Sequence, residues 1–354
     1  MRSDVFFVYL FFAVIFVVAL ETVMIFIRVD GANIQEIGMG HLYRMIFLAD
    51  YIYQKTRISP IFVISGYRET KSLLKLSNLK YIEINSKDEI NEILKLSPSL
   101  RKDILIIDMM DRDDNFIKRL VEKYIIFSFD DKKGGAKWSD VTINSVVGGP
   151  LDRENHYGPE YFLIRPEIAK YNLRHKTIVN SVKKILVCLG GSDPCSINLI
   201  LLEWLNGLAF SGQVRWVLGP SVNEKDLILE RLNNFNLDID PIIDYKNMGE
   251  LYFDADLCIS AAGFSLYEMA CVGLPAITVC LYPHQIPTAN KFEKAGVTCN
   301  LGHYGDTKEA VVKNALYRLF NDQSQRSSMS RKGKAFVDGL GIQRVMDKLI
   351  KFIN

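Results

Sequence analysis

Short apolar runs and amphipathic stretches alternate along the chain after Glu21, a pattern typical of β-α units that build a parallel sheet. In the first half, this pattern predicts five strands and a shorter sixth one. The predicted strands span residues 23–29, 61–65, 80–84, 104–108, 124–129 and 141–145. Between them, apolar residues at helical spacing predict helices over residues 42–55 and 113–124.

The same alternation restarts in the second half of the chain. Strands are predicted over residues 183–190, 213–219, 238–244, 255–260 and 274–282. Helices are predicted after Pro194, Asn223, Met248, Ser265 and Gln285. From Thr307 onward the pattern predicts helices without strands, and Gly339 and Gly341 break it before a last amphipathic run.

The length of 354 residues is too great for one ordinary core and fits two domains. We therefore predict an α/β protein with two doubly wound, Rossmann-like domains that face each other across a cleft. The predicted parts are an apolar segment over residues 1–21, an N-terminal domain over 22–170, a linker over 171–184 and a C-terminal domain over 185–354. Ligands of such sheets bind beyond the carboxyl ends of the strands.

Composition and charge narrow the choice of partners. Hydrophobic residues make up 49% of the chain and charged residues 24%, as in ordinary globular proteins, and the formal net charge is +2. A chain so close to neutral has no general attraction for a nucleic-acid backbone, so local groups must bind any anionic ligand. The six cysteines all lie in the second half without metal-ligand spacing, which indicates reduced thiols. We expect no metal and no cofactor.

Residues 5–20 form an uninterrupted apolar stretch of sixteen residues, whereas a membrane-spanning helix needs roughly 20. The flanks lack the basic region and the small-residue cleavage site of a secretory signal. A short membrane anchor, an upstream extension of the reading frame and a buried core helix remain as alternatives. Basic residues are more frequent after the segment than before it, so an anchored protein is expected to face the cytoplasm from the inner side of the cell membrane.

The first candidate site is the GMGH sequence of residues 38–41, between a predicted strand and a predicted helix. Gly38 and Gly40 allow a tight turn and a close approach to a phosphate, which a helix N-terminus attracts. His41 falls in the first turn, where the helix dipole disfavours a protonated ring, so it is the candidate general base. Arg44 on the same helix is a candidate substrate-binding residue. A histidine that only packs at a helix start is the alternative.

A second glycine-containing loop follows the first predicted strand of the second half. Gly190, Gly191 and Ser192 leave backbone amides open to a phosphate. Asp193, followed by a proline, predicts an N-cap and the start of a helix. A plain turn explains this sequence equally well.

A third loop joins a predicted strand to a predicted helix and contains Gly263, Ser265 and Glu268. The Glu268 carboxylate has the acceptors that two ribose hydroxyls would need. However, Ser265 and Glu268 also have the spacing of a capping box, which would satisfy the helix start without any ligand. The residue pattern by itself favours the cap.

Together these motifs resemble the glycosyltransferase-B (GT-B) superfamily, and within it the UDP-sugar hydrolases of the pseudaminic-acid pathway, whose relatives include the lipid II glycosyltransferase MurG. The resemblance extends over about residues 23–302. The motifs that carry it are RVDG, GMGH, YGPEYFLIRPE, ILVCLGGSDP, AAGFSLYEMACVGLP and HQIPTANKFEKAG.

The resemblance implies an enzyme that removes UDP from a 2,4-diacetamido-2,4,6-trideoxy sugar of the altropyranose type, by attack of water at the anomeric carbon. It implies that His41 activates this water. The implied substrate contacts are Gly190, Gly191 and Ser192 at the diphosphate, Glu268 at the ribose and Gln285 at the sugar or phosphate.

Two features depart from the hydrolases. His284 stands where they commonly have asparagine, and the apolar segment at residues 5–20 is not a family feature. An inverting glycosyltransferase is therefore a second hypothesis, in which His41 deprotonates an acceptor hydroxyl, for example that of a membrane lipid. A sugar-nucleotide-binding module without catalysis is a third, although a pure binder gains little from a histidine base.

Overall fold

The structure, a computed structural model, describes residues 23–353 apart from residues 33–36, 98–100, 110–111, 132–133, 147–155, 192, 194, 220–221, 244 and 246. The chain divides into two compact units. Unit 1 contains the described residues up to Tyr161 together with those from Gln343 onward, and unit 2 contains Phe162–Ile342. The apolar segment at residues 1–21 lies outside the described residues.

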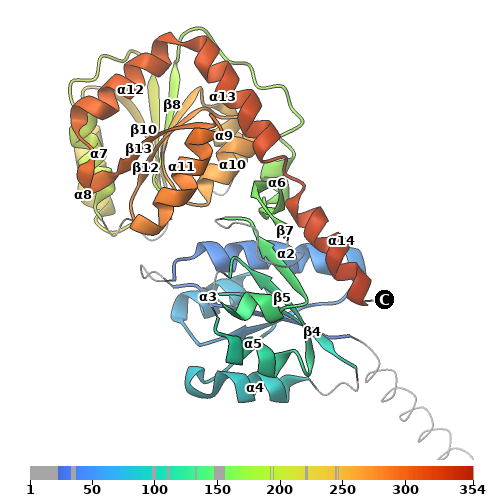
Figure 1. Ribbon diagram of the computed structural model, residues 1–354. Coiled ribbons are helices and arrows are strands. Elements are labelled where there is room, and N and C mark those ends of the chain that lie inside the picture. The colour runs from blue at the N-terminus through green and yellow to red at the C-terminus, as the bar shows by residue number, and fades with distance from the viewer. Residues whose placement is uncertain are drawn as a thin grey trace, which may run out of the picture. The chain divides into compact units, whose positions relative to one another are not determined.

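Unit 1 is built on a seven-stranded sheet whose neighbouring strands are all parallel (Figure 1). Its strands, in spatial order, are β3 (Tyr81–Glu83), β2 (Ile61–Ile64), β1 (Ile25–Val29), β4 (Asp103–Asp108), β5 (Tyr124–Phe129), β6 (Val141–Asn144) and β7 (His156–Tyr157). Its helices include α2 (Gly40–Thr56), α3 (Arg68–Leu76), α4 (Glu89–Leu96), α5 (Asp114–Leu120) and most of α14 (Gly341–Ile353). The central strands β1 and β4 are buried at every position, as expected for a parallel sheet covered on both faces.

Unit 2 repeats this architecture with a six-stranded parallel sheet. Its strands, in spatial order, are β10 (Asp238–Ile243), β9 (Gln213–Leu218), β8 (Lys184–Cys188), β11 (Leu257–Ala261), β12 (Ala276–Cys280) and β13 (Thr298–His303). Its helices include α6 (Pro166–Ala169), α7 (Ile197–Leu205), α8 (Lys225–Asn233), α9 (Met248–Asp254), α10 (Ser265–Val272), α11 (Ile286–Lys294), α12 (Glu309–Asn321) and α13 (Gln323–Phe336). The fully buried Trp216 of β9 anchors the core, and its indole N–H donates to Asn198 Oδ1 at 2.7 Å.

Every predicted strand is present, and its ends lie within two residues of the prediction. The structure adds β7 and β13, which the hydrophobic pattern did not reveal. β13 is only partly buried over its last four residues, so its sequence lacks a continuous apolar run. It also adds α3 and α4. α3 buries only Thr70 and Leu74, which is too few for a clear helical repeat.

The segment predicted as a linker, residues 171–184, is hydrogen-bonded to the rest of unit 2. Lys176 Nζ donates to the Ala255 carbonyl at 2.7 Å, just beyond the end of α9. Arg326 of α13 donates through Nη2 to the Asn180 carbonyl at 2.9 Å. Because these bonds hold the segment in place, the division between the units falls earlier in the chain than we predicted from the sequence.

The last helix, α14, packs with unit 1, although the predicted C-terminal domain extended over residues 185–354. Arg344 Nη1 donates to the Glu160 carbonyl at 2.7 Å. The Phe352 ring meets the Phe127 ring of β5 edge to face, with 5.6 Å between ring centroids. The amphipathic run after Gly341, which the sequence predicted, therefore covers the first sheet.

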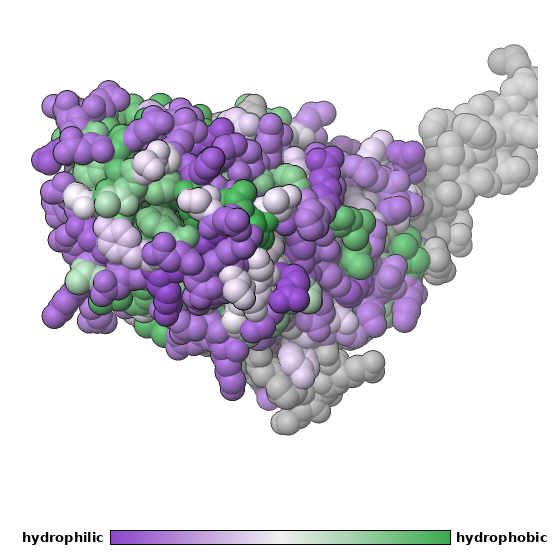
Figure 2. All heavy atoms as spheres, turned by 90° about the horizontal axis from the view of Figure 1, so that it is seen from above, coloured by the Kyte–Doolittle hydropathy of each residue, from purple (hydrophilic) through white to green (hydrophobic). Residues whose placement is uncertain are grey.

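Hydrophilic residues cover most of the face shown in Figure 2, and hydrophobic ones gather mainly in one area of it. Amphipathic helices produce such a surface because their apolar stripe faces the sheet. Within the part of the chain that the structure describes, no helix is both long enough and apolar enough to cross a membrane.

Candidate functional site

The strand order reverses at one place in each sheet. In unit 1 the chain runs outward from β1 through β2 to β3 and then returns to β4 on the other side of β1. In unit 2 it runs from β8 through β9 to β10 and returns to β11 on the other side of β8. The loops that leave two such central strands diverge, and ligands of doubly wound folds bind in the resulting crevice. One candidate site is therefore expected beyond β1 and β4, and another beyond β8 and β11.

His41 and Asp108 meet at the first of these places. His41 lies in the first turn of α2, which follows β1, and Asp108 is the last residue of β4. His41 Nδ1 lies 2.8 Å from Asp108 Oδ1; the carboxylate is fully buried, and the imidazole is 23% exposed. Arg44 Nη2 also lies 3.2 Å from Nδ1, but the carboxylate is the nearer neighbour. An ionised carboxylate only accepts hydrogen bonds, so we assign the proton to Nδ1, which leaves Nε2 as the acceptor nitrogen of a neutral ring. This is how a carboxylate orients a histidine general base.

Arg44 holds the same carboxylate. Its Nε donates to Asp108 Oδ2 at 2.6 Å and its Nη2 donates to Asp108 Oδ1, while Nη1 donates to Asp130 Oδ2 at 2.6 Å. Burial by itself would raise the pKa of Asp108, but the charges and hydrogen bonds of Arg44 and His41 outweigh burial and lower it to about 2. The Arg44 side chain is only 2% exposed. The structure thus places Arg44 against Asp108 and Asp130, and its contact with substrate stays a prediction.

Asp108 and Asp130 were not among the residues that the sequence singled out. Asp108 ends β4, and Asp130 directly follows β5. A carboxylate at the carboxyl end of a central strand is the signal that points to them. This signal becomes specific only when β4 is known to lie next to β1, which the hydrophobic pattern does not reveal.

Glycines shape the loop in front of His41. Gly38 has a φ of +67°, in the left-handed region that favours glycine, and its carbonyl accepts from Ala32 N at 3.2 Å. α2 begins at Gly40, with Met39 as its N-cap and no side-chain cap hydrogen bond. The helix N-terminus expected beside His41 is therefore present.

Gly190 and Gly191 follow β8 at the second place. Gly190 has a φ of +112°, which again favours glycine. A Cβ added to Gly191 would meet no atom of the described residues within 4 Å, so these residues leave open space beside it. Behind it, a Cβ on Gly219 would lie 2.6 Å from Gly191 Cα, so a third glycine supports the loop at close range. Ser192, the third predicted diphosphate contact, lies outside the described residues.

Asp193 caps the next helix from farther away than we predicted. α7 begins at Ile197 with Ser196 as its N-cap, not directly after Asp193. The Asp193 carboxylate still accepts from Ile197 N at 2.7 Å and from Asn198 Nδ2 at 2.7 Å. It is 6% exposed, and these hydrogen bonds fix the loop to the helix.

The capping box expected from Ser265 and Glu268 does not form. α10 begins at Ser265 itself, with Phe264 as its N-cap and no side-chain cap hydrogen bond. The Glu268 carboxylate instead accepts from Arg165 Nε at 2.9 Å and from the Tyr252 hydroxyl at 3.2 Å. Capping therefore no longer accounts for a glutamate at this position.

Arg165 and Tyr252 are further residues that the sequence did not single out, although Arg165 belongs to the YGPEYFLIRPE motif. Burial, the Cys188 thiol and the Glu268 carboxylate raise the pKa of Tyr252 well above its usual value, so the phenol stays protonated and donates. Burial opposes the charge on Arg165, but Glu268 outweighs it and raises the Arg165 pKa. The Glu268 side chain is 15% exposed, so part of the carboxylate remains accessible.

Gln285 and Gly263 lie close together beyond β12 and β11. Gln285 Oε1 accepts from Leu281 N at 2.8 Å and from Tyr282 N at 3.4 Å. These bonds direct the amide nitrogen the other way, and a Cβ on Gly263 would lie 3.9 Å from Gln285 Nε2. The structure thus brings both predicted residues to the same edge of the second sheet.

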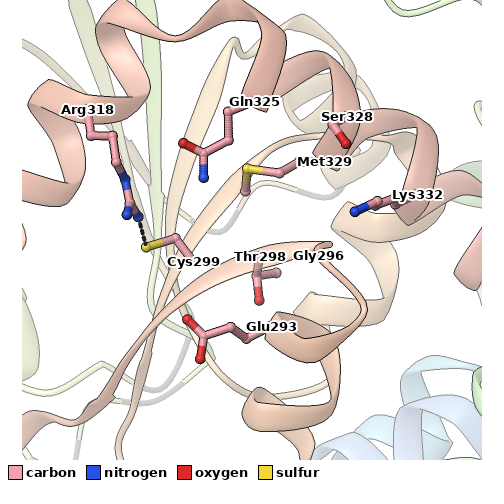
Figure 3. Close-up of a pocket in the computed structure, with 9 residues that line it drawn as sticks. All are labelled: Glu293, Gly296, Thr298, Cys299, Arg318, Gln325, Ser328, Met329 and Lys332. Carbon is pink, nitrogen blue, oxygen red and sulfur yellow. Dashed lines mark hydrogen bonds between the residues drawn. The ribbon is translucent and has the colours of Figure 1, made fainter.

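A cavity of about 270 Å³ lies elsewhere in unit 2 (Figure 3). Thr298, the first residue of β13, lines it together with residues of α11, α12 and α13. The cavity is therefore at the amino edge of the sheet, whereas Gly191, Gly263 and Gln285 are at the carboxyl edge. Among the described residues, no group of three or more His, Cys, Asp or Glu side chains is arranged to hold a metal ion.

This chain is similar to a known protein family and to several solved structures. Residues 185–344 match the glycosyltransferase family 28 C-terminal domain. The fold is similar to that of MurG from Acinetobacter baumannii, with a TM-score of 0.70 at 14% identity over 93% of this chain and 99% of MurG. It is also similar to Anabaena HepE in complex with UDP-glucose, with a TM-score of 0.55 at 11% identity over 93% of this chain and 100% of HepE. Two parallel-sheet α/β units of the GT-B type, as predicted, are confirmed.

Two proteins are similar to this chain in sequence. The chain is 26% identical over 322 residues to the spore coat polysaccharide biosynthesis protein SpsG of Bacillus subtilis, which covers 88% of this chain and 93% of SpsG. It is also 29% identical to the uncharacterized protein MJ1062 of Methanocaldococcus jannaschii, over 268 residues that make up 71% of this chain. It spans 54% of the length of that relative. The narrower assignment to pseudaminic-acid hydrolases stays a hypothesis.

Proposed function

We propose that the protein is an enzyme that acts on a UDP-sugar, in which unit 2 binds the UDP group and His41 of unit 1 activates the attacking hydroxyl. The His41 and Asp108 pair carries this proposal. A buried, ionised carboxylate at Nδ1 leaves Nε2 to accept a proton, which is what a general base must do. The family 28 match over residues 185–344, and the UDP-glucose complex of HepE, support a UDP-sugar as the ligand.

The nucleotide contacts follow the carboxyl edge of the second sheet. We assign Gly190, Gly191 and Ser192, with Gly263 and Ser265, to the diphosphate, Glu268 to the ribose and Gln285 to the sugar or phosphate. The open space that the described residues leave at Gly191 supports the first assignment, because a phosphate needs close access to backbone N–H groups. The partly exposed Glu268 carboxylate, already oriented by Arg165 and Tyr252, supports the second.

In the proposed reaction, the attacking oxygen forms a bond to the anomeric carbon while the bond from that carbon to the UDP oxygen breaks. UDP leaves with the bonding electron pair. The proton of the attacking hydroxyl passes to His41 Nε2, and the Asp108 carboxylate stabilises the imidazolium that forms. A single displacement in which the hydroxyl attacks opposite to the leaving UDP would invert the anomeric centre.

Two acceptors suit this chemistry. Transfer to another hydroxyl is supported by the family 28 match and by the similarity to SpsG. Hydrolysis, with water as acceptor, is supported by the resemblance of GMGH, YGPEYFLIRPE and GGSDP to the pseudaminic-acid pathway hydrolases. The apolar residues 5–20 would suit an enzyme whose acceptor is a membrane lipid.

Hydrolysis and transfer can be distinguished by incubating the purified protein with UDP-sugars and no acceptor. Suitable substrates are UDP-N-acetylglucosamine, UDP-glucose and UDP-2,4-diacetamido-2,4,6-trideoxyaltrose. Free sugar and UDP in equal amounts would identify a hydrolase. UDP release that requires an added polyprenyl or saccharide acceptor would identify a transferase. Protein that binds none of these nucleotides, and releases no UDP with any acceptor, would contradict the proposal.

The role of His41 is tested by His41→Ala. We expect turnover to fall by about 10² or more, the usual contribution of a general base, while UDP affinity stays within a few-fold. His175→Ala removes an exposed histidine of unit 2 and serves as the matched control. Unchanged turnover in the His41 variant would exclude it as the base.

A further inference from the structure

Thr298, the first residue of β13, is one of the residues that line the cavity at the amino edge of the second sheet. Thr298 is 7% exposed, and its Oγ1 has no hydrogen-bond partner within the described structure. Figure 3 shows Thr298 at the cavity, near Cys299 and Glu293.

Two cations reach the same cavity from opposite sides in Figure 3. Arg318 of α12 donates through Nη2 to Cys299 Sγ at 3.0 Å, and a thiol is a weak acceptor. Within the described residues, neither Arg318 nor Lys332 of α13 forms an ion pair with a carboxylate. Gly296 leaves room for the ammonium group, because a Cβ there would lie 2.6 Å from Lys332 Nζ.

The remaining walls define the size and polarity of a ligand. Gln325 and Ser328 add polar side chains, and the buried Met329 adds an apolar surface. Glu293 contributes one carboxylate, which accepts from Asn300 N at 3.1 Å. The volume of about 270 Å³ is slightly below the roughly 300 to 1,000 Å³ of common ligand pockets, so it suits a small metabolite.

We propose that this cavity binds a small ligand through one oxyanion group, a phosphate or a carboxylate, held between Arg318 and Lys332. Oxyanions accept several charge-assisted hydrogen bonds, and within the described residues both cations keep donors without an acceptor. Glu293 disfavours a second negative group and favours a hydroxyl or amino group on the ligand. This site is separate from the proposed UDP contacts and does not depend on them.

The test is a titration of the full chain with inorganic phosphate in the presence of saturating UDP, followed by calorimetry and phosphorus NMR. We expect saturable binding of one phosphate per chain. Lys332→Gln should weaken it roughly three- to fivefold, as for a partly exposed ion pair, and the Arg318→Gln, Lys332→Gln double variant should abolish it. Glu293→Gln should strengthen it by removing a repulsive charge.

Lys308→Gln is the matched control, because it removes the same charge from an exposed position at the start of α12. Its phosphate affinity should equal that of the wild type, and thermal unfolding should show that all variants are folded. Parallel titrations with glucose 6-phosphate and succinate distinguish phosphate esters from carboxylates by which binds more tightly. Uptake that does not saturate, an equal loss in the Lys308 variant, or phosphate binding that is found only when UDP is left out would overturn the proposal.

Discussion

Asp108 accepts a hydrogen bond from His41 at 2.8 Å, and the two residues belong to elements on either side of the reversal in strand order of the first sheet. Replacing Asp108 by asparagine would put an amide N–H donor where the ring nitrogen must donate. The imidazole would then adopt the other tautomer, with its proton on Nε2, and could not act as a base. We expect Asp108→Asn to lower turnover by roughly 10² to 10⁴, as in other carboxylate–histidine pairs.

Steady-state kinetics and UDP binding measured on the same preparation check this expectation. UDP affinity should change little, because Asp108 belongs to unit 1 and the assigned nucleotide contacts belong to unit 2. Asp114→Asn, which removes a partly exposed carboxylate from the same unit, is the control. Turnover equal to that of the control would show that Asp108 does not orient the base.

The low pKa of Asp108 also ties folding stability to pH. Its folded value of about 2 lies below the ordinary 3.8, so the ionised group stabilises the folded state. This contribution, about 2 kcal/mol, is complete above about pH 4 and is lost as the pH falls toward 2. Urea unfolding at pH 7, 4 and 2.5 measures the free energy of unfolding. This free energy should fall less at acid pH for Asp108→Asn than for the wild type. The same pH dependence of the unfolding free energy in both proteins would contradict a low pKa for Asp108.

Glu268→Gln tests the ribose contact. The amide is a weaker acceptor than the carboxylate, so UDP affinity should fall by about tenfold, while the free energy of unfolding changes by about 1 kcal/mol. Tyr252→Phe is the control, since it removes one donor to Glu268 but keeps the carboxylate. Calorimetric titration with UDP measures both variants. Normal UDP affinity in folded Glu268→Gln would exclude the ribose role.

Lys176 stabilises the segment that enters unit 2. Its Nζ donates to the carbonyls of Phe253 at 2.6 Å and Ala255 at 2.7 Å, and burial lowers its pKa to about 8. Lys176→Met would leave these buried carbonyls without a donor, so we expect a loss of about 2 kcal/mol in the free energy of unfolding. Chemical denaturation, with the exposed Lys170→Met as reference, measures the loss. Equal stability of the two variants would refute this role.

The apolar residues 5–20 lead to a prediction about membranes. Deletion of residues 1–20 should leave a protein that stays in solution and keeps its turnover, while the full chain should partition to membranes with both units on the cytoplasmic side. Cell fractionation and protease protection decide this. Full-length protein found wholly outside the membrane fraction would exclude an anchor, and a truncated protein that unfolds would assign the segment to the core.

Local sequence patterns were enough to place most of the sheet. β4 could be predicted because every one of its positions is buried, so it appears as a continuous apolar run. β13 could not, because its last four residues are only partly buried. The start of α10 was also misjudged, since Phe264 takes the N-cap position that Ser265 was expected to hold.

The residues of the candidate site could also be predicted only in part. Gly190, Gly191 and His41 lie in local motifs after strands, which a single sequence displays. The contacts of Asp108 with His41 and of Arg165 with Glu268 join residues 67 and 103 positions apart. Such pairs depend on strand order and on packing between distant segments, which periodicity does not encode.

The packing of α14 on unit 1 has a consequence for synthesis of the chain. Arg344 and Phe352 reach Glu160 and Phe127, so the first unit takes its last helix from the other end of the sequence. A ribosome releases the whole of unit 2 before this helix emerges. Until then, part of the first sheet has no cover, and the unit cannot be completed before α14 has been synthesised. Nascent chains that stop before α14 should therefore expose apolar surface on the unit that was made first.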